Sequence, residues 1–155
     1  MAKSKPIAWN ASSAAGENAV EHLPRLARRY FRAGRTLLKG KPSPAALHRF
    51  RLETKRFRYT LELFRLCYGP GLDLRLEKLR EIQVHLGEIS DCSATIELLG
   101  RVDRPFAGFL KRRMAAKIGA LHSYWQDSFD AAGQDTWWTQ YLARFARKQV
   151  GNEHR

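Results

Sequence analysis

The sequence predicts an all-α protein, an antiparallel four-helix bundle of long helices followed by a short C-terminal amphipathic helix. Apolar residues recur at steps of three and four along four long segments, and glycine and proline separate these segments. No segment alternates between apolar and polar residues as a half-buried strand does. A chain of 155 residues with 44% hydrophobic residues is typical of one domain, assigned here to residues 1–155 with a loose tail at residues 1–14.

The first predicted helix covers residues 17–39. Its inner, apolar side consists of Val20, Leu23, Leu26, Ala27, Tyr30, Leu37 and Leu38. Its opposite side carries a basic row, which consists of Arg25, Arg28, Arg29, Arg32, Arg35 and Lys39. Because the row lies directly opposite the apolar side, it either binds an anion or is simply solvated, and both interpretations stay open.

The second predicted helix begins after Gly40 and Pro42, with Ser43 as N-cap, and ends at residues 68–71. One apolar stripe faces the core and consists of Leu47, Phe50, Phe57, Leu61 and Phe64. A neighbouring arc, called the basic arc below, consists of His48, Arg51, Lys55, Arg58, Tyr59 and Glu62. Its cations repel one another unless something negative lies among them, so the arc is the strongest indication of function.

The third predicted helix covers residues 72–99, with Leu72, Leu76, Leu79, Ile82, Leu86, Ile89, Ile96 and Leu99 inward. Arg75, Lys78 and His85 form an outer row that either extends the basic face of the second helix or belongs to a salt-bridged surface with neighbouring acids. Gly87 interrupts the helix interior, which predicts a close helix contact or a bend there.

The fourth predicted helix covers residues 105–132, with Phe109, Leu110, Met114, Ile118, Leu121, Trp125 and Phe129 inward. A smaller basic patch on it consists of Lys111, Arg112, Arg113 and Lys117. After Gly133, a short amphipathic helix over residues 135–148 places Trp137, Trp138, Tyr141, Leu142 and Phe145 on one side. These five side chains either cap the bundle or contact another subunit.

The charge of the chain is strongly localised. The formal net charge is +13, and residues 25–65 hold 13 Lys and Arg against two acids, whereas the rest of the chain holds 15 bases and 13 acids. Such a charge attracts nucleic acid, anionic membrane or polymeric phosphate. Its concentration in one segment favours a dedicated binding surface over an evenly solvated one.

Cysteine usage and hydropathy predict a cytoplasmic protein without a membrane partner. Cys67 and Cys92 lack the C-x-x-C spacing and the His and Cys clusters of zinc sites, so we interpret them as small core residues. No apolar run approaches the roughly 20 residues that span a bilayer. The first 15 residues lack the apolar stretch of a secretory signal.

The second and third helices resemble the CHAD family, the conserved-histidine α-helical domain. The family signature His-x-x-Arg-x-x-x-(Lys/Arg)-(Lys/Arg)-x-Arg is matched by His48, Arg51, Lys55, Arg56 and Arg58. Tyr59 and Glu62 resemble the variant found in the second of the family's two repeats. The following stretch is similar to Lys-x-Leu followed by Leu-Gly-x-x-x-Asp, at Lys78, Leu79, Leu86, Gly87 and Asp91. The resemblance covers about residues 23–99.

The resemblance implies a four-helix bundle that binds inorganic polyphosphate through basic side chains and has no catalytic activity or cofactor. Family members usually contain two bundles related by pseudo-symmetry, whereas this chain carries the signature once. It therefore resembles half of the usual unit. We expect two copies to pair as a homodimer, the alternative being a single bundle that binds more weakly.

The residues themselves are compatible with the same ligand. A linear phosphate polymer offers repeated negative oxygens, which arginine forks grip in pairs and which a ladder of cations three and four residues apart can follow. His48 either contacts phosphate or is an ordinary satisfied histidine near the helix start. We expect the polyphosphate-binding residues to be His48, Arg51, Lys55, Arg56, Arg58, Tyr59, Lys78, Arg28 and Arg32.

Three other functions compete with polyphosphate binding. Nucleic acid is the main alternative. Tyr59 is the one aromatic residue in the basic arc, which argues against the stacking of single-stranded bases and leaves binding through the phosphate backbone of duplex DNA or RNA. An enzyme is not expected, because metal-assisted phosphate chemistry needs clustered carboxylates or histidines and the basic arc holds only Glu62. A scaffold that recruits acidic proteins is the third.

Overall fold

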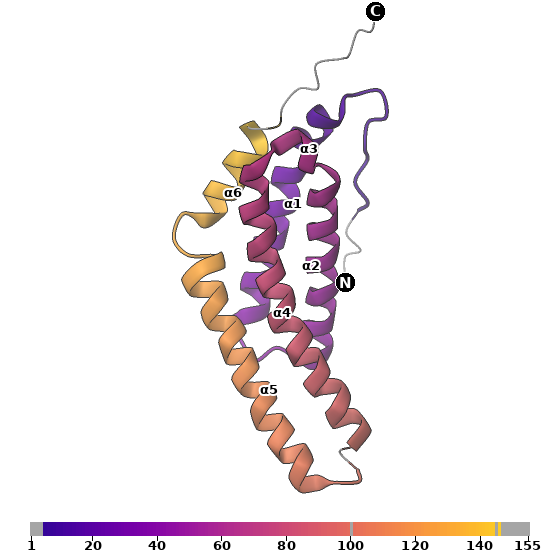
Figure 1. Ribbon diagram of the computed structural model, residues 1–155, viewed down its shortest axis with the longest axis vertical. Helices are drawn as coiled ribbons and strands as arrows, with labels where there is room; N and C mark the ends of the chain where they lie inside the picture. The colour runs from indigo at the N-terminus through magenta and orange to yellow at the C-terminus, as the bar shows by residue number, and fades with distance from the viewer. Residues whose placement is uncertain (1–4, 100, 145, 147–155) are drawn as a thin grey trace, which may run out of the picture.

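The computed structural model describes residues 5–99, 101–144 and 146, and every regular element among them is helical, which confirms the all-α class (Figure 1). The elements in chain order are α1 (Ala15–Leu38), α2 (Pro44–Leu63), α3 (Arg65–Tyr68), α4 (Pro70–Leu99), α5 (Arg104–Tyr124), the π-helical turn η1 (Trp125–Phe129) and α6 (Gln134–Arg144). None of the helices in these ranges is long and apolar enough to cross a bilayer.

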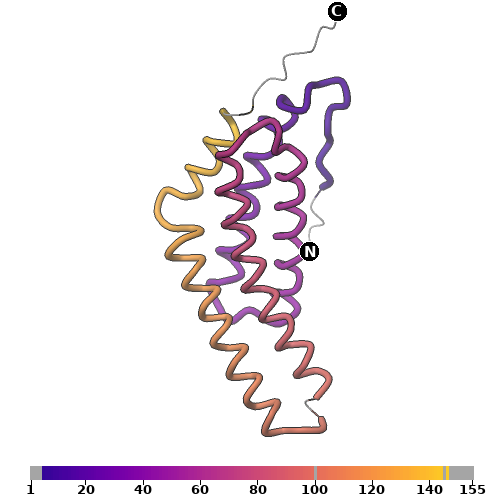
Figure 2. Tube along the Cα trace, viewed as in Figure 1, coloured from indigo at the N-terminus to yellow at the C-terminus, as the bar shows by residue number. Residues whose placement is uncertain are grey.

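Three helices, α1, α2 and α4, lie side by side, and α5 and α6 follow one another along their flank (Figure 1). Helix α6 packs on α1, and α5 packs on α4. The hairpin of α4 and α5 runs well past the ends of α1 and α2 at the end of the molecule opposite α6 (Figure 2). This projecting part of the hairpin therefore has no α1 or α2 layer to cover it.

An aromatic cluster forms the centre of the core. Tyr30 stacks on Phe50 with ring centroids 5.1 Å apart, and Phe31 stacks on Phe129 at 5.0 Å. The Tyr30 hydroxyl shares a 2.8 Å hydrogen bond with the Thr54 hydroxyl, and burial raises the pKa of Tyr30. Apolar rings from α1, α2 and η1 thus meet around one satisfied polar pair.

The second predicted helix is shorter than expected, because it ends at Leu63 rather than near residue 68. Phe64 leaves helical geometry with φ −100° and ψ 12°, and the short α3 follows in a new direction. Cys67 and Tyr68 are both buried as a result, and the Tyr68 hydroxyl donates to the Leu142 carbonyl oxygen at 2.8 Å. Because the chain turns at Phe64, the Tyr68 side chain reaches Leu142, and this hydrogen bond holds α3 against α6.

The fourth predicted helix is divided. Helix α5 ends at Tyr124, and the following π-helical turn closes with the Asp130 amide donating to the Trp125 carbonyl oxygen at 2.7 Å. Helix α6 buries Trp138 and Leu142 against the bundle, as a cap would. At the predicted end of this helix, residues 145, 147 and 148, and thus Phe145, lie outside the described residues.

Two residues predicted to face inward are exposed. Val20 has 37% of its surface accessible and Phe109 has 48%, whereas Phe31, which the periodicity left out, is buried at 1%. The buried side of α1 includes Phe31 because α6 covers that side of the helix. The Phe31 and Trp138 rings lie 6.0 Å apart there. Phe109 is exposed because it lies on α5, the helix of the projecting hairpin.

Candidate polyanion-binding surface

Helix α4 contacts both α2 and the short α3 that follows it, and two contacts mark the ends of this seam. At one end, the Arg65 Nε lies 2.8 Å from an Asp73 carboxylate oxygen. At the other end, His48 lines a cavity together with Leu86 and Ser90. The start of the basic arc therefore lies beside α4, and the arc continues from His48 along α2.

The cations of the basic arc gather along this seam. Arg51, Lys55 and Arg58 are half-buried on α2, because they follow at steps of four and three on one helical face. Within the described ranges, Arg51 and Lys55 make no ion pair and no hydrogen bond through their side chains. His48 and Tyr59 flank them as exposed side chains. The structure therefore brings five of the predicted site residues together.

Among the described residues, Arg58 is the one cation of the arc with an internal partner. Its Nε lies 3.4 Å from a Glu62 carboxylate oxygen, one helical turn later, and its guanidinium carbon lies 4.9 Å from the Tyr59 ring centroid. The Nε atom is buried, and its geometry to Glu62 is that of an ion pair without a hydrogen bond. Glu62 and Tyr59 thus hold the guanidinium in place on two sides.

Gly87 on α4 does not make the close helix contact that was one of the two alternatives predicted for it. A Cβ added at Gly87 would have no atom within 4 Å outside its own helix. The glycine therefore leaves open space on the surface of α4. Nearby on α4, the Gln83 Oε1 atom is buried without a hydrogen-bond partner in the described structure.

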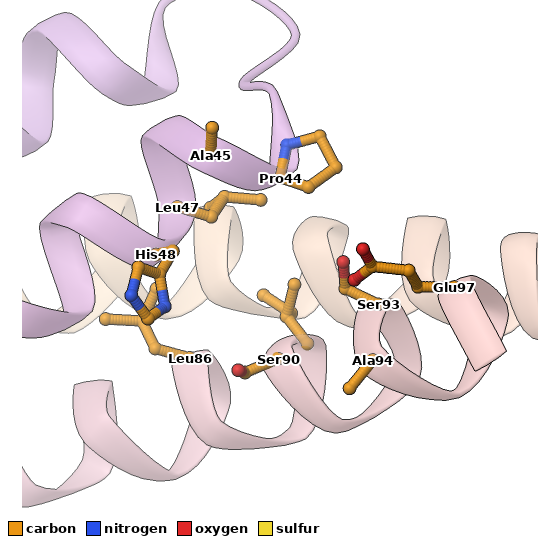
Figure 3. Close-up of a pocket in the computed structure, with 10 residues that line it drawn as sticks. Pro44, Ala45, Leu47, His48, Leu86, Ser90, Ser93, Ala94 and Glu97 are labelled. Atoms are coloured by element: carbon orange, nitrogen blue, oxygen red, sulfur yellow. The ribbon is translucent and has the colours of Figure 1, made fainter.

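An open cavity of about 370 Å³ lies where the start of α2 meets α4 (Figure 3). His48 stands at one end beside Leu86, and Glu97 stands at the other end near Ser93 (Figure 3). The lining is otherwise mainly apolar, with Ser90 and Ser93 as hydroxyl donors. An anion is therefore favoured at the His48 end, which continues into the basic arc, and disfavoured by Glu97 at the other end.

Lys78 and its neighbours lie on the other side of α4, so the interpretation that they extend the basic arc is wrong. The Lys78 amine donates to the Ser128 carbonyl oxygen at 3.3 Å and to Gln134 Oε1 at 3.2 Å, and burial lowers its pKa. The His85 ring packs against the Tyr124 ring at 5.4 Å. Both side chains therefore face the corner formed by α5 and α6.

Arg75 is the largest departure from the sequence analysis, because this predicted surface cation is only 2% exposed. Its guanidinium carbon lies 3.4 Å from the Trp137 ring centroid and 3.7 Å from the Tyr141 ring centroid. It donates to the carbonyl oxygens of Gly71 at 3.0 Å and Trp137 at 2.9 Å, and burial lowers its pKa to about 10. Arg75 is thus a structural clamp for α6.

The basic row of α1 is divided between two neighbours. Arg35 turns toward α6, where its guanidinium binds Asp130 at 2.6 Å and Asp135 at 2.9 Å. Arg28, two turns before Arg35, shares that face. Arg29 and Arg32 instead line a groove between α1 and α2. Of the two site residues predicted on this helix, the structure places Arg32 in the groove beside α2, whereas Arg28 is exposed outside that groove.

The sequence analysis left two basic residues of this groove, Arg29 and Arg49, out of the predicted site. Arg49, on the side of α2 that faces α1, lines the same groove as Arg29. Arg56, which was predicted, is exposed two turns after Arg49 and shares its face rather than that of the basic arc. The seven-residue spacing from Arg49 to Arg56 was the available signal. In the described ranges, no three His, Cys, Asp or Glu side chains come together to hold a metal ion.

Comparison with known proteins gives one match. A family model described as the CHAD domain matches residues 2–100, which include α1, α2, α3 and α4. No curated protein and no solved structure matches the chain.

Proposed function

Because the chain belongs to the CHAD domain family, we propose that it binds inorganic polyphosphate without catalysis, through the basic arc of α2. The observation that carries the proposal is that Arg51 and Lys55 are partly buried and lack an ion-pair partner among the described residues. Like charges held on one helical face are destabilising, and a polymeric anion lying along the seam offsets that repulsion.

Each side chain of the basic arc has a role in this proposal. Arg51 and Arg58 grip pairs of phosphate oxygens with their planar guanidinium groups, and Lys55 between them neutralises charge. Tyr59 donates its hydroxyl, and Glu62 keeps Arg58 in position through the 3.4 Å ion pair. His48 contacts the chain where the seam opens into the cavity at the start of α2.

Salt-dependent binding tests the proposal. The variant Arg51→Ala/Lys55→Ala/Arg58→Ala is compared with a control that removes the same charge from exposed positions on α5, Arg104→Ala/Lys111→Ala/Arg112→Ala. Counterion release makes wild-type affinity for polyphosphate fall steeply with salt, and each lost contact should lower the slope by about one. We expect the arc variant to lose about three units of slope and the control to lose less than one. Equal losses in the two variants would rule out the arc as the site.

The absence of catalysis is part of the proposal and has its own test. The basic arc contains one carboxylate, Glu62, which is already paired with Arg58. Phosphate release is measured during incubation of the protein with polyphosphate and magnesium, and we expect none above the rate without protein. Turnover that disappears in Glu62→Ala would instead make the protein a phosphohydrolase.

Nucleic acid is the second candidate, and one observation favours it. Phe106 and Phe109 are exposed at 40% and 48%, with their rings 6.2 Å apart, on a helix that also carries basic residues. Exposed aromatic pairs next to cations are typical of surfaces that stack single-stranded bases. We expect long-chain polyphosphate to compete better than DNA or RNA of matched charge. Preference for nucleic acid, lost in Phe106→Ala/Phe109→Ala, would support the second candidate.

Two copies of the chain pair in this proposal, because the family signature occurs once in it. The projecting hairpin supports pairing, since Leu98 is 78% exposed and Val102 is 82% exposed. Light scattering measures the molar mass with and without polyphosphate. We expect a dimer, and a monomer in both conditions would leave the single bundle as the binding unit.

A further inference from the structure

A second groove runs along α2 on the side opposite the basic arc, between α1 and α2. Its volume is about 390 Å³. The apolar floor consists of Ala33, Leu37, Ala46 and Phe50. The polar lining consists of Arg29, Arg32 and Thr36 from α1 and of Arg49 and Glu53 from α2. Arginines therefore stand on both walls of one open groove.

The arginines of this groove have no internal partners in the part of the chain that the structure describes. Within the described ranges, the side chains of Arg29, Arg32 and Arg49 make no hydrogen bond and no ion pair. Glu53 lines the same groove without forming an ion pair with any of them. Three cations against one carboxylate leave the groove with a positive excess. Arg35, by contrast, belongs to the same basic row and is neutralised by Asp130 and Asp135.

The groove and the basic arc flank the same helix. Arg49 faces α1, whereas Arg51 lies on the seam with α4. Helical positions two residues apart differ by about 200° around the axis, so these side chains point to opposite sides of α2. Arg56, exposed two turns after Arg49 on the same face, continues the groove side of α2. A helix with its side chains is about 10–12 Å wide, so only an extended anion reaches from one side of α2 to the other.

We propose that the groove lined by Arg29, Arg32 and Arg49 is a second polyphosphate track, so that one long chain crosses α2 and occupies both the groove and the basic arc. This inference rests on the proposed function, and it adds a dependence on chain length. A chain bound to one track is held at high effective concentration near the other, which raises the affinity of long chains without new contacts. Tripolyphosphate is shorter than the width of a helix and occupies one track at a time.

The polymer suits the groove better than a compact anion does. The groove is open and its floor is apolar, so it offers no enclosed set of donors around a single phosphate. Its arginines instead stand on two walls, and guanidinium forks on both sides of an extended chain can each bind a different pair of oxygens. Binding through several weak contacts along a chain therefore fits these residues.

Affinities for long-chain polyphosphate and for tripolyphosphate are measured for four proteins. These are the wild type, the groove variant Arg29→Ala/Arg32→Ala/Arg49→Ala, the arc variant Arg51→Ala/Lys55→Ala/Arg58→Ala and the α5 control Arg104→Ala/Lys111→Ala/Arg112→Ala. We expect the groove variant to bind long chains about tenfold more weakly than the control does, with tripolyphosphate affinity lowered by no more than about twofold, because the basic arc still offers one track. Circular dichroism checks that all variants keep their helical content.

The outcomes separate the inference from the proposed function. A groove variant that matches the α5 control for both ligands overturns the second track and leaves the arc untouched. An arc variant that matches the control for both ligands overturns the proposed function. Glu53→Gln gives an independent measurement, because removal of the one carboxylate in the groove should tighten long-chain binding severalfold. Unchanged or weaker long-chain binding by Glu53→Gln contradicts the second track.

Discussion

Arg75 and Trp137 are joined in two ways, because the guanidinium carbon lies 3.4 Å from the Trp137 ring centroid while Nη2 donates to the Trp137 carbonyl oxygen at 2.9 Å. The first contact holds the Trp137 side chain, and the second holds the backbone of α6 at the same residue. Tyr141 packs one helical turn later at 3.7 Å from the same guanidinium. A single arginine on α4 thus fixes both the position and the rotation of α6.

We predict that Arg75→Ala destabilises the protein strongly. It removes two charge-assisted hydrogen bonds to carbonyl oxygens and a buried cation–π contact, so the free energy of unfolding should fall by about 3 kcal/mol. Arg75→Lys should recover little, because an ammonium lacks the planar fork. Chemical denaturation measures the change, with Arg80→Ala as control, since its exposed ion pair with Glu77 should be worth under about 1 kcal/mol. Equal effects at both positions would contradict the clamp.

We predict that Gly34→Ala is destabilising because there is no space for its methyl group. A Cβ at Gly34 would overlap the ring of Trp125, which is itself 2% exposed and packed in the core. Overpacking of this kind costs about 1–3 kcal/mol. Gly108→Ala is the matched control, since its Cβ would meet only an Arg112 side-chain atom at 3.7 Å. Thermal denaturation should show a lower midpoint for Gly34→Ala alone.

We predict that Gly87→Ala stabilises the protein and that Gly87→Leu weakens its binding of polyphosphate. Since no atom lies within 4 Å of an added Cβ, Gly87→Ala should stabilise the helix by about 0.5–1 kcal/mol. Gly87→Leu should keep the helix and weaken polyphosphate binding, because its side chain fills the open space at Gly87 on α4, the helix that packs along α2. Gly119 on α5 is equally open, so Gly119→Leu is the control for both measurements. Unchanged polyphosphate affinity in Gly87→Leu would show that the ligand does not use this space.

We predict a pH-dependent contribution from the ion pair of Arg35 and Asp135. The Arg35 guanidinium holds the pKa of Asp135 below its usual range, so the stabilisation is present above the unfolded pKa, near 3.9, and is lost as pH falls through the folded pKa. Both side chains are nearly half-exposed, at 44% and 42%, which limits the effect to under about 1 kcal/mol. Asp135→Asn should therefore be less stable than wild type at neutral pH and equally stable in strong acid.

Urea denaturation at several pH values measures this difference. Asp127→Asn is the control, because Asp127 is exposed and forms no ion pair in the described part of the chain. A stability difference between Asp135→Asn and wild type that stayed constant down to strong acid would show that the ion pair is not its cause.

The length of a predicted helix depended on what packs against its ends. Periodicity located α2 well, but it did not show the break at Phe64, where α3 turns to bury Tyr68 against α6. The end of α5 at Tyr124 was not predicted for the same reason. The π-helical turn that follows places Trp125 against Gly34 of α1, and this tertiary contact is not visible in the local spacing. Elements were predictable from local spacing, whereas their ends were decided by distant segments.

By itself, the sequence determined that the chain is helical, that it belongs to the CHAD family and that Arg51, Lys55 and Arg58 share one face, because helical spacing is a local property. Only the tertiary structure decided how each cation is used. Arg75 is an internal clamp, Arg35 is neutralised by acids about a hundred positions away, and Arg49 joins Arg29 in a groove. Whether a cation is paired depends on which helix faces it, and that is fixed by the packing of residues far apart in the chain.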